Sequence, residues 1–123
     1  MATWLAVAVA GALGAVARYE VDGLVSARFT SFPYGTLAVN LSGCFLLGLL
    51  FTLFTEHLHV ATWIRSGATI GFLGAYTTFS TFSLESFRLA EDGAVGLALA
   101  NVGASVGLGL VAVYAGVVLG RAL

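Results

Sequence analysis

The chain has 123 residues, of which 59% are hydrophobic and only 9% are charged, and its formal net charge is −1. Soluble domains carry about 25% charged residues, and one of this length could not bury so much apolar surface, so a soluble globular protein is excluded. The charge also excludes a nucleic-acid surface, which needs a basic patch. We expect a single domain over residues 1–123 whose solvent is the lipid bilayer.

Four apolar runs follow one another along the chain, at residues 2–19, 33–55, 63–88 and 94–120. Each is close to the roughly 20 residues that a membrane-spanning helix needs. We interpret the first run as a membrane helix that ends near Arg18 rather than as a signal peptide, because no basic segment precedes it and further apolar runs follow. The predicted fold class is an all-α integral membrane protein with four transmembrane helices.

The basic residues give almost no preference for one orientation in the membrane. With four spans, Arg65 and Arg121 lie on one side, whereas Arg28 and Arg88, together with Arg18 if it counts as flanking, lie on the other. Positive charge normally accumulates on the cytoplasmic side and so sets the orientation. A balanced count predicts dual topology, and with it an antiparallel homodimer, which also suits a chain too thin to enclose a pore alone.

Two pairs of glycines have the spacing that lets membrane helices approach closely. They are Gly67 with Gly71 and Gly103 with Gly107. With 16 glycines in the chain, some matches arise by chance. Each pair is compatible with packing inside one subunit or with contact between subunits.

The third run contains a predicted interruption. Gly71 and Gly74 are poor helix formers, and the β-branched pair Thr77-Thr78 is little better. A helix broken within a bilayer frees backbone carbonyls, which then need protein, water or a cation as partners. We therefore predict an irregular point near residues 74–78, at membrane depth, where broken helices often mark ion sites.

Directly after this point, the stretch FSTFS combines two aromatic rings with hydroxyl groups. Phe79 and Phe82 are three residues apart and share a helical face, with Ser80, Thr81 and Ser83 on neighbouring faces. Hydroxyls donate to anions, and the edges of phenylalanine rings are electropositive. The pattern suits a small dehydrated anion. For each residue an alternative remains, in which the rings only pack and the hydroxyls only bond to a carbonyl of the preceding helical turn.

Asn40 is the polar residue of the second run that needs a partner. A polar side chain at this depth usually faces the protein interior or a water-filled cavity. An interhelical hydrogen bond and a place in an ion path are both compatible with the sequence.

Three motifs occur in order: GALGAVARY at 11–19, GTLAVNLSG at 35–43 and GFLGAYTTFSTFSLE at 71–85. They resemble the Fluc (CrcB-type) family of fluoride channels, through motifs in three helices and through length and apolarity in the fourth. The resemblance implies a fluoride-selective channel in the cell membrane. Such a channel lets cytoplasmic fluoride leave passively, through two pores formed by an antiparallel homodimer.

The resemblance also implies residue roles. It implies a fluoride pore at Asn40, Phe79, Ser80, Thr81, Phe82 and Ser105. It implies a vestibule or pore-flanking position for Arg18, Glu85 and Asn101. It implies a structural sodium ion at the dimer centre, held by backbone carbonyls of Gly74 and Thr77, two from each subunit.

The chain departs from the family pattern at three positions. Ala75 stands where many members have a second glycine, Asn101 where some have tyrosine, and Gly109 where some have serine. The backbone at the implied sodium site must therefore suit alanine, and Ser105 is the firmest residue of the fourth-helix polar track.

Two other function classes fit the sequence less well. A small multidrug-type proton-coupled exporter has similar length and helix number but relies on a buried glutamate in its first helix, and here the first carboxylate is Glu20, at the end of that run. A non-transporting assembly subunit would lack a polar pore track. An enzyme is not expected, because neither Cys44 nor any serine has a histidine placed in its sequence context to act as a base.

Overall fold

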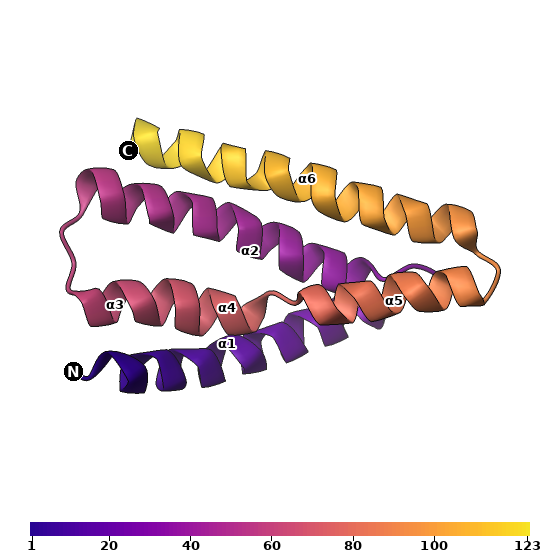
Figure 1. The fold of residues 1–123 in the computed structure, drawn as a ribbon, viewed down its shortest axis with the longest axis horizontal. Helices are drawn as coiled ribbons and strands as arrows, with labels where there is room; N and C mark the ends of the chain where they lie inside the picture. The colour runs from indigo at the N-terminus through magenta and orange to yellow at the C-terminus, as the bar shows by residue number, and fades with distance from the viewer.

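Long helices lying side by side make up the computed structural model, which describes all residues from 1 to 123 (Figure 1). In chain order the elements are α1 (Thr3–Ser26), α2 (Tyr34–Thr52), η1 (Leu53–His57), α3 (Thr62–Ser66), η2 (Gly67–Leu73), α4 (Gly74–Tyr76), α5 (Phe79–Glu91) and α6 (Val95–Ala122). The two η elements are π-helical turns, which often occur at functional sites. The regular structure is therefore all helical, as predicted.

Three unbroken helical segments are long and apolar enough to cross a membrane: Thr3–Ser26, Tyr34–His57 and Val95–Ala122. The third predicted run is divided among α3, η2, α4 and α5. Apolar side chains cover the outer surfaces of these helices, and only 19 of 123 residues are buried. This distribution is that of a protein whose outer surface faces lipid.

Both termini lie at the end of the molecule that also holds the connection between η1 and α3 (Figure 1). The loop between α1 and α2 and the turn between α5 and α6 lie at the opposite end. Gly93 makes that second turn possible with a positive φ of 84°, a conformation that glycine adopts without steric cost. The third run, predicted to reach residue 88, ends at Glu91, just before this turn.

The first helix is longer than predicted. The expectation that it ends near Arg18 is wrong, because α1 continues for about two more turns to Ser26. Its polar residues find partners beside the helix: Arg18 Nε donates to the Ala75 carbonyl at 3.1 Å, and Ser26 Oγ donates to Asp22 at 3.0 Å. Charged residues therefore mark the polar last turns of α1 and not its end.

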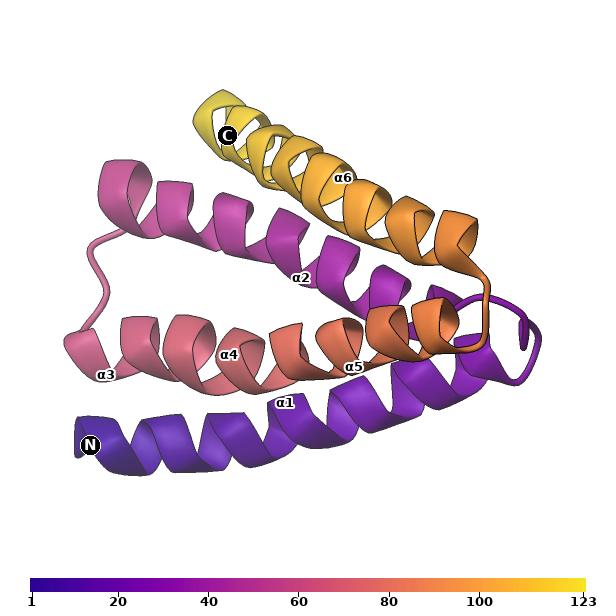
Figure 2. The same ribbon diagram turned by 45° about the vertical axis from the view of Figure 1, so that its right-hand side comes forward.

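Helix packing depends on close approaches at glycine. α2 and α6 lie side by side, and α1 runs along the third, broken segment (Figure 2). A Cβ atom at Gly48 would lie 2.3 Å from the Val113 carbonyl oxygen, and one at Gly14 would lie 2.2 Å from that of Phe72. Small residues thus bring helix backbones together where no hydrophobic effect drives association.

The two predicted glycine pairs have different environments. A Cβ atom at Gly71 would lie 2.8 Å from the Val7 carbonyl oxygen, so the first pair serves packing inside the chain. Gly103 and Gly107 have no heavy atom of another part of the chain within 4 Å of such an atom. The second pair therefore lies on an outer surface of α6.

We predict that Gly48→Ala destabilises the fold by about 1–3 kcal/mol, because the added methyl group forces α2 away from α6. Gly23→Ala is the matched control, since it adds the same methyl group within a helix where the chain leaves open space, away from the surface of Gly103 and Gly107. Thermal unfolding in detergent micelles measures both variants. Equal midpoints for Gly48→Ala and Gly23→Ala would contradict the close-approach explanation.

Candidate functional site

The third predicted helix breaks at Thr77 and Thr78. Thr77 has φ −87° and ψ 155°, and Thr78 has φ −146° and ψ 115°, so two extended residues separate α4 from α5. The predicted interruption near residues 74–78 is confirmed, at the C-terminal end of that range. Thr78 then starts α5 as its N-cap, with Oγ1 accepting from Thr81 N–H at 3.2 Å.

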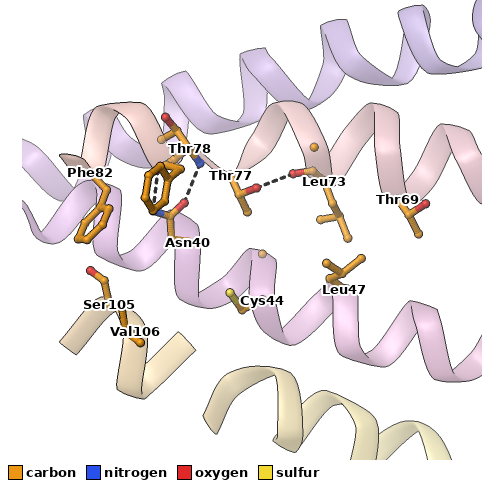
Figure 3. Close-up of a pocket in the computed structure, with 13 residues that line it drawn as sticks. Asn40, Cys44, Leu47, Thr69, Leu73, Thr77, Thr78, Phe82, Ser105 and Val106 are labelled. Atoms are coloured by element: carbon orange, nitrogen blue, oxygen red, sulfur yellow. Dashed lines mark hydrogen bonds between the residues drawn. The ribbon is translucent and has the colours of Figure 1, made fainter. Parts of the chain in front are cut away.

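Asn40, on the neighbouring helix α2, stabilises the break through two hydrogen bonds. Its Nδ2 donates to the Thr78 carbonyl at 3.0 Å, and its Oδ1 accepts from Thr78 N–H at 2.8 Å (Figure 3). One side-chain amide therefore bonds to both the N–H and the carbonyl of Thr78, which are not paired within a helix. Of the two alternatives left by the sequence, the interhelical hydrogen bond is present, and Asn40 also lines the cavity described below.

The carbonyl groups of residues 74–77 lose the donors that an uninterrupted helix would give them. In an uninterrupted helix the Gly74 carbonyl would accept from Thr78 N–H, but that group donates to Asn40. The Thr77 carbonyl would accept from Thr81 N–H, which instead donates to Thr78 Oγ1. The Ala75 carbonyl accepts from Arg18 instead. The break thus leaves the Gly74 and Thr77 oxygens, like that of Tyr76, with free lone pairs beside the same two-residue interruption.

A cavity of about 300 Å³ adjoins the break, between α2, α6 and the third segment (Figure 3). Six of the residues proposed from the sequence line it: Asn40, Gly74, Thr77, Phe79, Phe82 and Ser105. The other lining residues are Gly43, Cys44, Leu47, Thr69, Leu73, Thr78 and Val106. No lining residue carries a charge, so polar atoms here are amide, hydroxyl, thiol and backbone groups.

The two phenylalanines lie together at this cavity but differ in exposure. Their ring centroids are 5.6 Å apart and the ring planes are inclined at 58°. Phe82 is 9% exposed, whereas Phe79 is 80% exposed. The Phe79 ring is therefore almost uncovered within one chain.

Ser80 and Thr81 do not line the cavity. Ser80 is exposed, and Thr81 is half-buried with Oγ1 accepting from Thr78 Oγ1 at 3.0 Å. Within one chain, Thr81 serves the start of α5.

The three residues placed at a vestibule or beside the pore have separate environments. Arg18 contacts the break itself, through the Ala75 carbonyl. Glu85 accepts from Thr36 Oγ1 at 2.5 Å and lines a second cavity of about 380 Å³, near the loop between α1 and α2. Asn101 is 2% exposed, lines neither cavity, and donates through Nδ2 to Ser86 Oγ at 2.9 Å.

Sequence reasoning missed several partners. Thr36 is 49 residues from Glu85 in sequence, and Ser86 is 15 residues from Asn101, so no local pattern reveals either contact. Thr78 had a usable signal, because a threonine just before a helical segment is a preferred N-cap. Thr69 and Cys44 reach the cavity only because α2 and η2 face each other across it.

Comparison with known proteins gives consistent results. The family model described as "CrcB-like protein, Camphor Resistance (CrcB)" matches residues 5–117. A protein of Geobacter sulfurreducens is 51% identical over 124 residues, covering 100% of both chains. Proteins of Acidobacterium capsulatum (47% identical, 96% of this chain and 95% of the relative) and Magnetococcus marinus (51% identical, 94% of each) are also similar. All three relatives are named "Fluoride-specific ion channel FluC".

Proposed function

Since the chain belongs to the CrcB-like protein family, we propose that it is a fluoride-specific ion channel of a membrane. The structural observation that carries the proposal is the uncharged cavity beside the helix break, where Asn40 and the Phe79–Phe82 pair meet. Three unbroken helices are long and apolar enough to cross a membrane, which supports a multi-pass protein. The broken third segment is the proposed fourth span, and the proposed location is the cell membrane.

The cavity chemistry suits a small anion that has shed its water. Phenylalanine ring edges and hydroxyl hydrogens carry partial positive charge, so they attract an anion without presenting a full positive charge. A fixed guanidinium or ammonium group would bind fluoride and slow its departure, and conduction needs weak binding. Because no lining residue is charged, the cavity favours conduction of the anion over tight binding.

Passive exit of fluoride needs no energy coupling in this chain. Hydrogen fluoride is a weak acid, so its neutral form crosses bilayers and dissociates inside the cell. A path for the anion alone then prevents accumulation in the cytoplasm. We propose export of this kind through two pores in a dimer.

An antiparallel homodimer is the proposed assembly. The nearly balanced arginines, the open surface at Gly103 and Gly107, and the uncovered ring of Phe79 support it. A ring that is 80% exposed contributes to a closed ion path only if lipid or a second subunit covers it. A second copy with inverted orientation would bring its own Phe79 and Phe82 to the same region.

A structural sodium ion is proposed at the centre of this dimer. The carbonyl oxygens of Gly74 and Thr77 fit the role, because each has lost its helical donor and hard cations prefer oxygen ligands. Two such oxygens from each subunit would surround one ion. Ala75 is accommodated there with its carbonyl turned to Arg18, so the methyl group does not prevent the break.

We expect fluoride efflux to slow when protein purified without sodium is assayed with a large organic cation on both faces of the vesicle. The expected cause is loss of a cation that joins the two breaks, and returning sodium should restore the rate. Equal rates with and without sodium would contradict the structural sodium ion while leaving the channel proposal intact.

The proposed function is tested by ion efflux from liposomes that contain the purified protein, measured with fluoride and chloride electrodes. We expect rapid fluoride release with no chloride release above that of protein-free vesicles. Comparable release of the two anions would contradict a selective fluoride path. No fluoride release from protein shown to be dimeric would contradict the channel proposal for a homodimer.

A further inference from the structure

We propose that Asn101 is a positioning residue for Phe82 and that it acts through Ser86. The inference deepens the proposed fluoride conduction and rests on it. Asn101 lies on α6 and lines no cavity, whereas Phe82 lies on α5 and lines the cavity at the break. Ser86 connects the two.

A continuous chain of donors runs from α6 to the backbone of Phe82. Asn101 Nδ2 donates to Ser86 Oγ at 2.9 Å, and Ser86 Oγ donates to the Phe82 carbonyl at 2.9 Å. The exposed fractions are 2% for Asn101 and 9% for both Ser86 and Phe82. Because water has little access here, no solvent molecule replaces either bond when it is removed.

The position of this contact explains why it bears on the ring. Asn101 and Ser105 are four residues apart on α6, so they share a face one turn apart. Phe82 and Ser86 have the same spacing on α5. Since Phe82 and Ser105 both line the cavity, the Asn101–Ser86 contact fixes α5 against α6 one turn beyond the cavity wall.

Ser83 shows what a serine does without the contact from α6. Its Oγ also donates to the carbonyl four residues earlier, that of Phe79, at 2.9 Å. No side chain of another helix bonds to Ser83, and the Phe79 ring is 80% exposed. The bond from Asn101 therefore ties the Phe82 segment to α6, whereas the Thr36–Glu85 bond ties the same helix to α2.

The test measures fluoride efflux from liposomes for the parent, Asn101→Leu, Ser86→Ala and the double variant. The rate of release reports conduction through each channel, and its extent reports the fraction of vesicles that hold a folded channel. Thr52→Val is the matched control, because Thr52 is also 2% exposed and bonds only to the Gly48 carbonyl at 2.9 Å. Thr52 does not line the cavity, so this variant should keep the parental rate and extent.

We expect each single variant to release fluoride about fivefold more slowly at unchanged extent, the effect of one lost interhelical hydrogen bond. The double variant should also be about fivefold slower, and not about 25-fold, because both changes remove one chain of bonds. If Asn101→Leu cannot be purified, the milder Ser86→Ala carries the same comparison of rate and extent.

Three results would overturn the inference. Parental rates in both single variants would show that Phe82 does not need the contact, and multiplied effects in the double variant would show that the residues act independently. A reduced extent at the parental rate would show a role in folding alone. A parent protein that releases no fluoride would contradict the proposed function instead, so the two failures are distinguishable.

Discussion

Phe79→Ile should release fluoride about tenfold more slowly than the parent, which corresponds to the loss of about 1.4 kcal/mol of favourable interaction with the passing ion. Isoleucine keeps an apolar side chain but has no ring quadrupole and so no electropositive edge. Because Phe79 is 80% exposed within one chain, the change removes little packing inside the subunit. Isoleucine also keeps an apolar surface toward a second subunit, so the amount of assembled dimer should stay unchanged. Phe82→Ile should slow efflux similarly, with some loss of stability because Phe82 is 9% exposed.

Phe87→Ile is the matched control for these two variants. Phe87 lies on the same helix, is 61% exposed and lines neither the cavity at the break nor the one at Glu85. Fluoride efflux from liposomes, together with size-exclusion chromatography of the dimer, compares the three substitutions. Parental efflux in both Phe79→Ile and Phe82→Ile would remove the aromatic-edge explanation, even if the protein conducts fluoride.

The sequence was sufficient for features that depend on local patterns. Lengths and apolarity of the runs predicted helices close to those observed, and the weak helix formers around Gly74 and Thr77 predicted the break. The spacing of Phe79 and Phe82 predicted rings on one face, and they lie 5.6 Å apart between centroids. Each of these features depends on residues that follow one another within one segment of the chain.

Features that depend on distant residues could not be predicted. Arg18 does not mark the end of the first helix, and its partner there is the Ala75 carbonyl, 57 residues away in sequence. Nothing near Asn101 indicates that Ser86 would be its partner and that it would lie outside the cavity. In a bilayer such polar contacts specify how helices meet. Apolar side chains cover every face of these helices, so apolarity alone does not determine which face packs against a neighbour.

Substitution of Asn40 should have the largest combined effect on structure and conduction. Asn40→Leu leaves Thr78 N–H and the Thr78 carbonyl without partners, at a cost of about 1–3 kcal/mol for each group. The extended break then has no support from α2, and we expect both less dimer and no measurable fluoride efflux. Ser42→Ala is the control on the same helix: it removes a 2.9 Å bond to the Tyr76 hydroxyl and should have a much smaller effect.

Asn40→Asp separates the two roles of this residue. A carboxylate still accepts from Thr78 N–H, but it places a second oxygen against the Thr78 carbonyl, which has then lost its donor. It also adds negative charge to a cavity whose lining is uncharged, which repels an anion. We therefore expect Asn40→Asp to retain more dimer than Asn40→Leu, yet to conduct no fluoride. Parental efflux in Asn40→Asp would mean that the anion does not pass this amide, and parental efflux in Asn40→Leu would mean that the break holds its shape without it.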